Sequence, residues 1–257
     1  MIRLTTTSFA CFFLVTALPT VSTAQRPHSS VVVGESLVNV KSPKPGKLAS
    51  PFGVDFDKRG NMYIVELSGG RVHKLDTAGN LTTIAGDGTK NYSGDGGPAK
   101  DATFNGMHNV AVTPVGDIFI ADSWNHCIRR IDGKTGIITT FAGTGEPGFS
   151  GDGGPADQAT FNFLMCVSLN STNDKLYVAD LKNLRIRTID LKTGIVDTVA
   201  GNGEKGVPEN GEQANESPLV DPRAVAVDSK NNIYVLERSG HALRMVTPDG
   251  KIRTVAG

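Results

Sequence analysis

Apolar and polar residues alternate over short runs from residue 51 to residue 257, and Gly, Asn, Asp or Pro separates one run from the next. Period-two runs bounded by such residues predict β-strands. No stretch with helical periodicity interrupts these runs. The pattern therefore predicts an all-β fold.

The predicted strands fall into four similar units, at about residues 48–86, 104–143, 161–201 and 219–257. Each unit closes on Ala-Gly, and the closing glycines are 57, 58 and 56 residues apart. The second strand of each unit ends in an acid, at Glu66, Asp122, Asp180 and Glu237. A four-stranded unit cannot bury both of its faces alone, whereas sheets arranged radially bury each other. The repeats therefore predict a β-propeller of four-stranded blades.

The connection between the second and third strands carries a recurring pattern. Residues 122–129 read Asp-Ser-Trp-Asn-His-Cys-Ile-Arg, and Asn183 and His241 fall in the same register. Over residues 51–257 the chain resembles NHL-repeat β-propellers, of the exported bacterial type with Gly-Asp-Gly-Gly-Pro-Ala loops. Such propellers usually have six blades, so the resemblance implies an open or truncated part of a six-bladed ring, with a closed four-bladed ring as the alternative. An open ring favours self-association.

The Gly-Asp-Gly-Gly-Pro-Ala segments stand between units, at residues 94–99 and 151–156. We expect tight turns in which glycine takes a positive φ and Pro98 or Pro155 opens a single helical turn. Calcium binding by Asp95 and Asp152 is the alternative. A single aspartate per loop supplies few of the oxygens that calcium requires, so the structural turn is favoured.

The N-terminal segment predicts export. Arg3 precedes an apolar run at residues 9–18, and small residues follow at 22–24, which predicts a signal peptide over residues 1–24. We therefore expect a periplasmic, cell-surface or secreted protein. The apolar run is about half of the roughly 20 residues that a membrane span needs, so no transmembrane span is expected after signal removal. Residues 25–47 predict an N-terminal strand, at 31–40, that latches a final blade, followed by a linker.

Composition excludes several kinds of partner and site. The 26 basic residues balance 26 acidic residues, which argues against a nucleic-acid binder. Signal removal leaves two cysteines, Cys127 and Cys166, which are too few for a structural zinc site. Buried free thiols are the favoured prediction for both cysteines, and a disulfide between them is the alternative.

The candidate site lies where first strands begin and where the second-to-third loops open, because a propeller presents both on one face. Aligning the units places Phe52, His108, Met165 and Arg223 at equivalent positions beside the central channel. Aromatic and Arg residues are enriched at binding hot spots. The predicted ligand-binding residues are these four together with Asn109, Trp124, Lys182 and Arg238. No catalytic or metal-ligating set is predicted.

Other polar residues have a structural interpretation. His126 and His241 recur in equivalent units, which favours a packing or capping role. The strand-ending acids recur in every unit, so we expect them to tie strand ends to Asn, Arg or backbone donors. His73 lies within a strand pattern and is expected at a sheet edge or surface.

The leading functional prediction is a binding module for a protein, peptide or glycan. A module within a larger surface protein is a related possibility. A metal-dependent lyase or lactonase-like hydrolase is the alternative. Resemblance to peptidyl-hydroxyglycine amidating lyases would imply zinc held by three channel histidines, and only His108 matches such a position. Resemblance to lactonase-like propellers would imply calcium, with Asn109 as the one candidate ligand. We therefore expect no cofactor, with zinc or calcium as the alternative.

Overall fold

Four antiparallel sheets, three of four strands and one of five, form the blades in the computed structural model, which describes residues 31–33, 36–38 and 48–257. Blade 1 contains β3 (Pro51–Phe56), β4 (Met62–Glu66), β5 (Val72–Leu75) and β6 (Leu81–Ala85). Blade 2 contains β7 (Met107–Val112), β8 (Ile118–Asp122), β9 (Cys127–Ile131) and β10 (Ile138–Ala142). Blade 3 contains β12 (Leu164–Leu169), β13 (Lys175–Asp180), β14 (Arg185–Asp190) and β15 (Ile195–Ala200), with β11 (Gly154–Pro155) added beside β15. Blade 4 contains β16 (Pro222–Val227), β17 (Ile233–Glu237), β18 (Ala242–Val246) and β19 (Ile252–Ala256).

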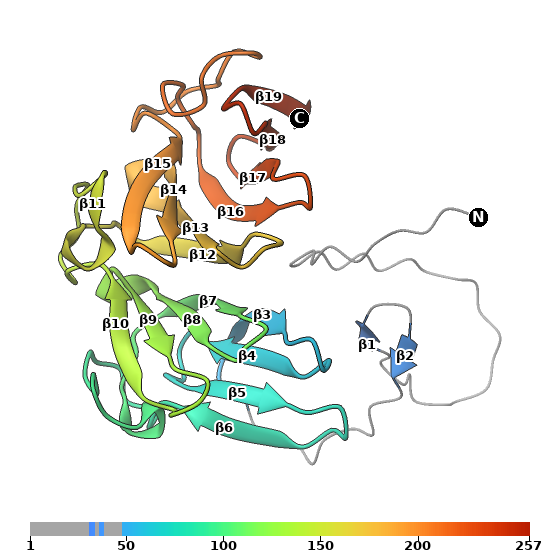
Figure 1. The fold of residues 1–257 in the computed structure, drawn as a ribbon, viewed down its shortest axis with the longest axis vertical. Coiled ribbons are helices and arrows are strands. Elements are labelled where there is room, and N and C mark those ends of the chain that lie inside the picture. Colours follow the sequence, from blue (N-terminus) through green and yellow to red (C-terminus); the bar gives the residue numbers. More distant parts are fainter. Residues whose placement is uncertain (1–30, 34–35, 39–47) are drawn as a thin grey trace.

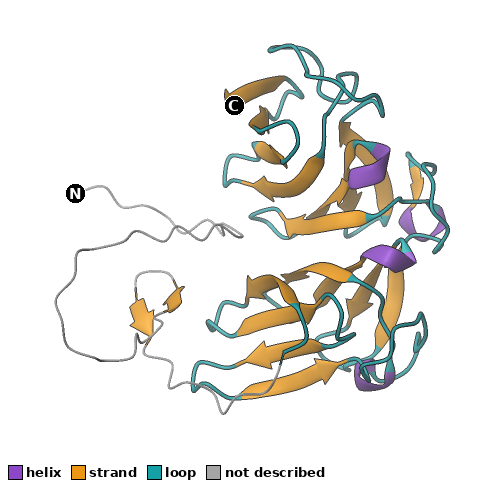
Figure 2. Cartoon of the chain, turned by 180° about the vertical axis from the view of Figure 1, so that it is seen from behind, coloured by secondary structure: helices purple, strands orange, loops and turns teal. Residues whose placement is uncertain are grey.

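Within the described residues, helical structure is limited to single turns between strands, as Figure 2 shows. These turns are η1 (Ala99–Asp101), η2 (Ser123–Asn125), η3 (Ala156–Gln158) and η4 (Leu181–Asn183). Pro98 and Pro155 stand immediately before η1 and η3, as expected from the sequence.

The blades follow one another around an arc (Figure 1). The inner strands contact each other in the order β3, β7, β12 and β16. The strands β6, β10 and β19 lie at the other edge of their sheets, and in blade 3 the short β11 lies outside β15. No extensive contact joins β3 to β16 within the described part of the chain, so blades 1 and 4 form the two ends of an open arc. The prediction of an all-β propeller with four blades is confirmed.

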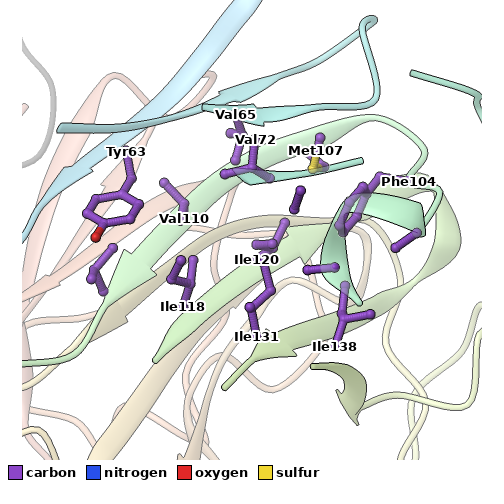
Figure 3. Close-up of a cluster of buried hydrophobic side chains, with 14 residues drawn as sticks. Tyr63, Val65, Val72, Phe104, Met107, Val110, Ile118, Ile120, Ile131 and Ile138 are labelled. Atoms are coloured by element: carbon purple, nitrogen blue, oxygen red, sulfur yellow. The ribbon is translucent and has the colours of Figure 1, made fainter. Parts of the chain in front are cut away.

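Apolar cores between consecutive blades hold the arc together. In the first core, Tyr63 and Val65 of β4 face Ile118 and Ile120 of β8, as Figure 3 shows. The alternation of side chains along each strand gives a blade two apolar faces, one for each neighbour. Equivalent positions form the second core (Phe119, Ala121, Leu176 and Val178) and the third core (Tyr177, Ala179, Ile233 and Val235). Each blade therefore packs only against the blades next to it.

The loops between blades cover the edge of the following sheet. The backbone N–H of Gly96 donates to the carbonyl of Ile138 in β10, and Gly153 and Gly211 make the same bond to β15 and β19. Gly96 and Gly153 have φ of +81° and +78°, which confirms the predicted glycine turns. Pairing a loop with the outermost strand removes an open sheet edge.

The structure describes only part of the N-terminal segment for which the sequence makes predictions. The predicted signal peptide at residues 1–24 lies outside the described residues. Within residues 25–47, β1 (Val31–Val33) pairs with β2 (Ser36–Val38) in a two-stranded sheet, and the latching of a final blade by residues 31–40 stays a prediction. Cys127 and Cys166 are both buried and not joined in a disulfide. Within the described ranges, no helix has the length and apolar character needed to cross a membrane.

Candidate functional site

A β-bulge marks the start of every inner strand. In each blade the register between the first and second strands shifts by one residue, and the extra residue is Phe52, His108, Met165 or Arg223. A bulge re-aims the side chain that it carries. The structure thus confirms that these four predicted residues are equivalent, and it places them at the same end of their blades.

The acid at the end of each second strand holds the segment that leads into the bulge. Asp122 accepts the backbone N–H of Asn105 at 2.7 Å, and Asp180 accepts that of Asn162 at 2.8 Å. Glu66 accepts the N–H of Ala49, and Glu237 accepts that of Val220. Asn125 and Asn183 donate to the second oxygens of Asp122 and Asp180. The expectation that these acids tie strand ends to nearby donors is confirmed.

A buried base completes each of these acid sites. Arg129 Nη1 lies 3.7 Å from Asp122, and Arg187 Nη1 lies 3.9 Å from Asp180. In blade 4, Arg244 Nε lies 2.8 Å from Glu237. The equivalent residue of blade 1 is His73, so the prediction that His73 lies at an edge or surface is wrong. His73 is buried in the interior strand β5 because it takes the arginine position, and its Nε2 lies 3.2 Å from Glu66.

Burial controls the titration of these acids. It raises the pKa of Asp122 and of Asp180 to about 6, because desolvation disfavours the carboxylate more than the hydrogen bonds and the nearby arginine favour it. Neither carboxyl is exposed to solvent. These acids therefore lie inside the fold, where their hydrogen bonds hold the strand ends.

The aspartates of the glycine turns are also engaged. Asp95 lies 2.7 Å from Arg129, and Asp152 lies 2.6 Å from Arg187. The Thr140 hydroxyl donates to the second oxygen of Asp95, and the Thr198 hydroxyl donates to that of Asp152. These contacts support the structural interpretation of the turns over calcium binding. Within the part of the chain that the structure describes, no three His, Cys, Asp or Glu side chains gather as a metal site would require.

Four aromatic residues meet at the bulge of blade 2, and we call Phe52, His108, Trp124 and Phe163 the aromatic cluster. The His108 ring makes edge-on contacts with Phe52, Phe163 and Trp124, at centroid distances of 4.8, 5.2 and 6.5 Å. His108 is only 7 % exposed, whereas Phe52 is 48 % and Trp124 is 40 % exposed. The cluster therefore has a buried centre and two rings open to solvent.

His108 is held in one orientation, and its surroundings lower its pKa. Its Nδ1 lies 2.7 Å from the Gly106 carbonyl oxygen, so Nδ1–H donates and Nε2 is left as an acceptor. Burial lowers the pKa of His108, the Gly106 carbonyl opposes this shift, and the positive charge of Arg223 adds to it. The imidazole is consequently neutral near pH 7.

Phe163 was not among the predicted site residues. It has φ of +64°, which is rare for a residue other than glycine, and its backbone N–H donates to His126 Nδ1 at 3.2 Å. The equivalent residue in blade 2 is Gly106, with φ of +65°. A Cβ on Gly106 would lie 2.3 Å from Trp124, so glycine there makes room for the indole ring. The replacement of Gly by Phe between aligned units was a sequence signal for this site.

His126 and His241 follow the structural interpretation. His126 ends η2 in the left-handed conformation, and its ring accepts the Phe163 N–H. His241 has φ of +47°, and its N–H donates to the Arg238 carbonyl in a similar turn. Both histidines therefore shape the loops between second and third strands.

Cationic side chains flank the aromatic cluster. Lys90 Nζ lies 5.9 Å from the centroid of Trp124, and Lys182 Nζ lies 5.9 Å from that of Phe163. In blade 4, Arg223 Nε lies 3.1 Å from both oxygens of Asp221, and Arg238 lies 3.8 Å from the same carboxylate. Lys90 was not predicted, because only the folded loop between blades 1 and 2 brings it over Trp124.

Two predicted residues have other contacts. Asn109 Oδ1 accepts the N–H of Val167 at 3.1 Å, which ties the inner strands of blades 2 and 3 together. Met165 is partly buried against the core between blades 3 and 4. The structure thus gathers Phe52, His108, Trp124 and Lys182, while Arg223 and Arg238 surround Asp221.

Comparison with known proteins supports the fold and the repeat. Residues 104–131 match the NHL repeat family. The chain is 27 % identical over 232 residues to Protein SUPPRESSOR OF QUENCHING 1, chloroplastic, of Arabidopsis thaliana, and 25 % identical over 236 residues to NHL repeat-containing protein 2 of Gallus gallus. These alignments cover 84 % and 83 % of this chain but only 21 % and 32 % of the relatives.

Among solved structures, a streptogramin B lyase superposes with a TM-score of 0.54 at 14 % identity. The match covers 81 % of this chain and 55 % of the lyase chain. At this identity the match shows a common fold alone. The family match thus identifies an NHL repeat at residues 104–131, and relatives that contain NHL repeats align with most of this chain. The solved structure shares the β-propeller fold.

Proposed function

We propose that this chain is a binding module that holds a protein or peptide partner on the aromatic cluster. The observation that carries the proposal is the pair of exposed rings, Phe52 and Trp124, packed on the buried and hydrogen-bonded His108. Rings held in place before binding lose little conformational freedom when a partner docks, and exposed aromatic residues dominate binding hot spots. A glycan would use the same rings and is the alternative partner class.

We also propose that this binding takes place outside the cytoplasm. The support is the charged, then apolar, then small-residue order of residues 1–24, which is typical of an export signal.

The donor set does not favour a metal-dependent lyase or hydrolase. The four bulge positions hold one imidazole, that of His108, beside Phe52, Met165 and Arg223. A catalytic zinc needs three protein ligands. Asn109, the one candidate ligand for a calcium ion, already uses its oxygen to bind the Val167 N–H.

The test is selection of peptides from a random displayed library on the full chain, followed by titration of a selected peptide against variants. We expect Trp124→Ala and Phe52→Ala each to weaken peptide binding at least about thirtyfold, the loss of a hot-spot residue. Thermal unfolding should change less than peptide binding does, because both rings are partly exposed.

The matched control is Phe149→Ala, which removes an exposed aromatic side chain outside the cluster. This variant should bind the selected peptide as the unaltered chain does. A selection that enriches no peptide, or an equal loss of affinity in the control, would overturn the proposed function.

A further inference from the structure

Within the part of the chain that the structure describes, two of the cations around the aromatic cluster have no carboxylate at ion-pair distance. Lys90 and Lys182 are exposed, and among the described residues neither lies within ion-pair distance of a carboxylate. Each ammonium instead lies over a ring of the cluster, at 5.9 Å from Trp124 or Phe163. A cation over the face of an aromatic ring is held beside apolar surface while it keeps its charge available.

Two further cations, Arg223 and Arg238, extend this positive charge towards blade 4. Arg223 and Arg238 share a single carboxylate, Asp221, whose Oδ2 also accepts the backbone N–H and the hydroxyl of Ser239. Arg238 lies at the longer distance and its side chain is 71 % exposed. One carboxylate therefore faces two guanidinium groups, and an excess of positive charge remains.

This excess is local. The whole chain has as many acidic as basic residues, so the cations at this end of the blades do not reflect a general basic character. Charge complementarity across an interface selects partners and speeds association more than it adds affinity. A basic rim around exposed rings thus matches a partner that carries carboxylates beside an apolar side chain.

We propose that the aromatic cluster selects an acidic peptide segment with an apolar or aromatic anchor residue, an inference that rests on the proposed function. The rings of Phe52 and Trp124 take the anchor. Lys90, Lys182 and Arg238 pair with carboxylates on either side of it. His108 Nε2, the free acceptor at the centre of the cluster, accepts a backbone N–H of the peptide.

The test uses three short labelled peptides of identical length that share one Trp and one Leu and differ only in carrying several Glu, Gln or Lys residues. Their binding to the full chain is measured by fluorescence anisotropy at low and high salt, beside a single-stranded oligonucleotide. We expect the Glu peptide to bind about tenfold more tightly than the Gln peptide at low salt, and less so at high salt. The Lys peptide and the oligonucleotide should bind most weakly.

The double variant Lys90→Gln/Lys182→Gln should lower the affinity for the Glu peptide about tenfold and leave the Gln peptide unchanged. The control, Lys58→Gln/Lys230→Gln, makes the same charge change in the turns that follow β3 and β16, at the other ends of these strands. It should leave both affinities unchanged.

Any of four results would overturn the charge selectivity. These are equal binding of the Glu and Gln peptides, tighter binding of the oligonucleotide, no binding by any peptide, and an equal effect in the control. These outcomes leave the proposed function to be decided by the ring substitutions on library-selected peptides. Conversely, ring substitutions without effect would overturn the proposed function whatever the peptide charge.

Discussion

The buried arginines of blades 2, 3 and 4 are matched by acids in one of two ways. In blades 2 and 3 the strand ends in Asp, which stays 3.7 to 3.9 Å from the arginine, and a loop aspartate approaches to 2.7 or 2.6 Å. In blade 4 the loop residue is Asn210, which accepts the N–H of Thr254, and the longer Glu237 reaches Arg244 itself. Charge is thus balanced in each of these blades, although the balancing residue changes.

We predict that Arg129→Met lowers the free energy of unfolding by about 3–5 kcal/mol, because it leaves Asp122 buried without its positive partner. Chemical denaturation followed by circular dichroism measures the change. The control is the next residue, Arg130→Met, whose partly exposed ion pair with Asp117 should account for about 1 kcal/mol or less. Similar losses in both variants would show that burial of the acid is not the cause.

At the scale of the element, the aromatic cluster is built from the bulges of the inner strands and from the residue before β7 or β12. That residue has a positive φ in both blades, yet it is Gly106 in one and Phe163 in the other. Glycine leaves space in which Trp124 lies, and phenylalanine fills the corresponding space with its own ring beside His108. Two different solutions at one backbone position therefore build the two sides of the aromatic cluster.

We predict that Gly106→Ala displaces Trp124, because the added Cβ would lie 2.3 Å from the indole ring. Trp124 is the only tryptophan, so its fluorescence emission reports the displacement directly and should shift towards the solvent-exposed value. The control is Gly96→Ala, which has a similar backbone strain at φ of +81° but has nothing within 4 Å of the new Cβ. An unshifted emission in Gly106→Ala, or the same shift in the control, would contradict the packing.

At the scale of the whole molecule, stability is distributed among three separate cores. Each core joins only two consecutive blades, and no extensive contact joins β3 to β16 within the described part of the chain. In assemblies built of repeated units, a local loss of packing acts mainly on the nearest neighbours. Disturbing one core should therefore leave the far end of the arc protected.

We predict that Ile120→Ala, in the core between blades 1 and 2, accelerates hydrogen exchange in β4 and β5 far more than in β17 and β18. Truncation of a fully buried isoleucine costs about 2–5 kcal/mol. The mirror variant, Ile186→Ala in the core between blades 3 and 4, should show the reverse order. Exchange that accelerates evenly along the chain in both variants would show that the blades open as one unit.

Much of this organisation could be predicted from the amino-acid sequence. The four units, the period of the strands, the glycine turns and the equivalence of Phe52, His108, Met165 and Arg223 all follow from internal repetition, because equal segments in a repeat fold take equal places. The prediction that His73 lies at a sheet edge or surface was wrong because it used the strand pattern and not the alignment of the units. The pattern around His73 matches a strand, but only alignment with Arg129 and burial beside Glu66 show that it takes the arginine position inside the sheet.

By itself, the sequence determined the fold class, the number of blades and the end of each blade at which the varying residues lie, since these depend on local periodicity and on register. Only the tertiary structure decided which of these residues meet. Lys90, Trp124, His108 and Phe163 come from different loops and strands, and they come together because neighbouring blades pack face to face. Contacts between blades depend on that packing, which no single repeat records.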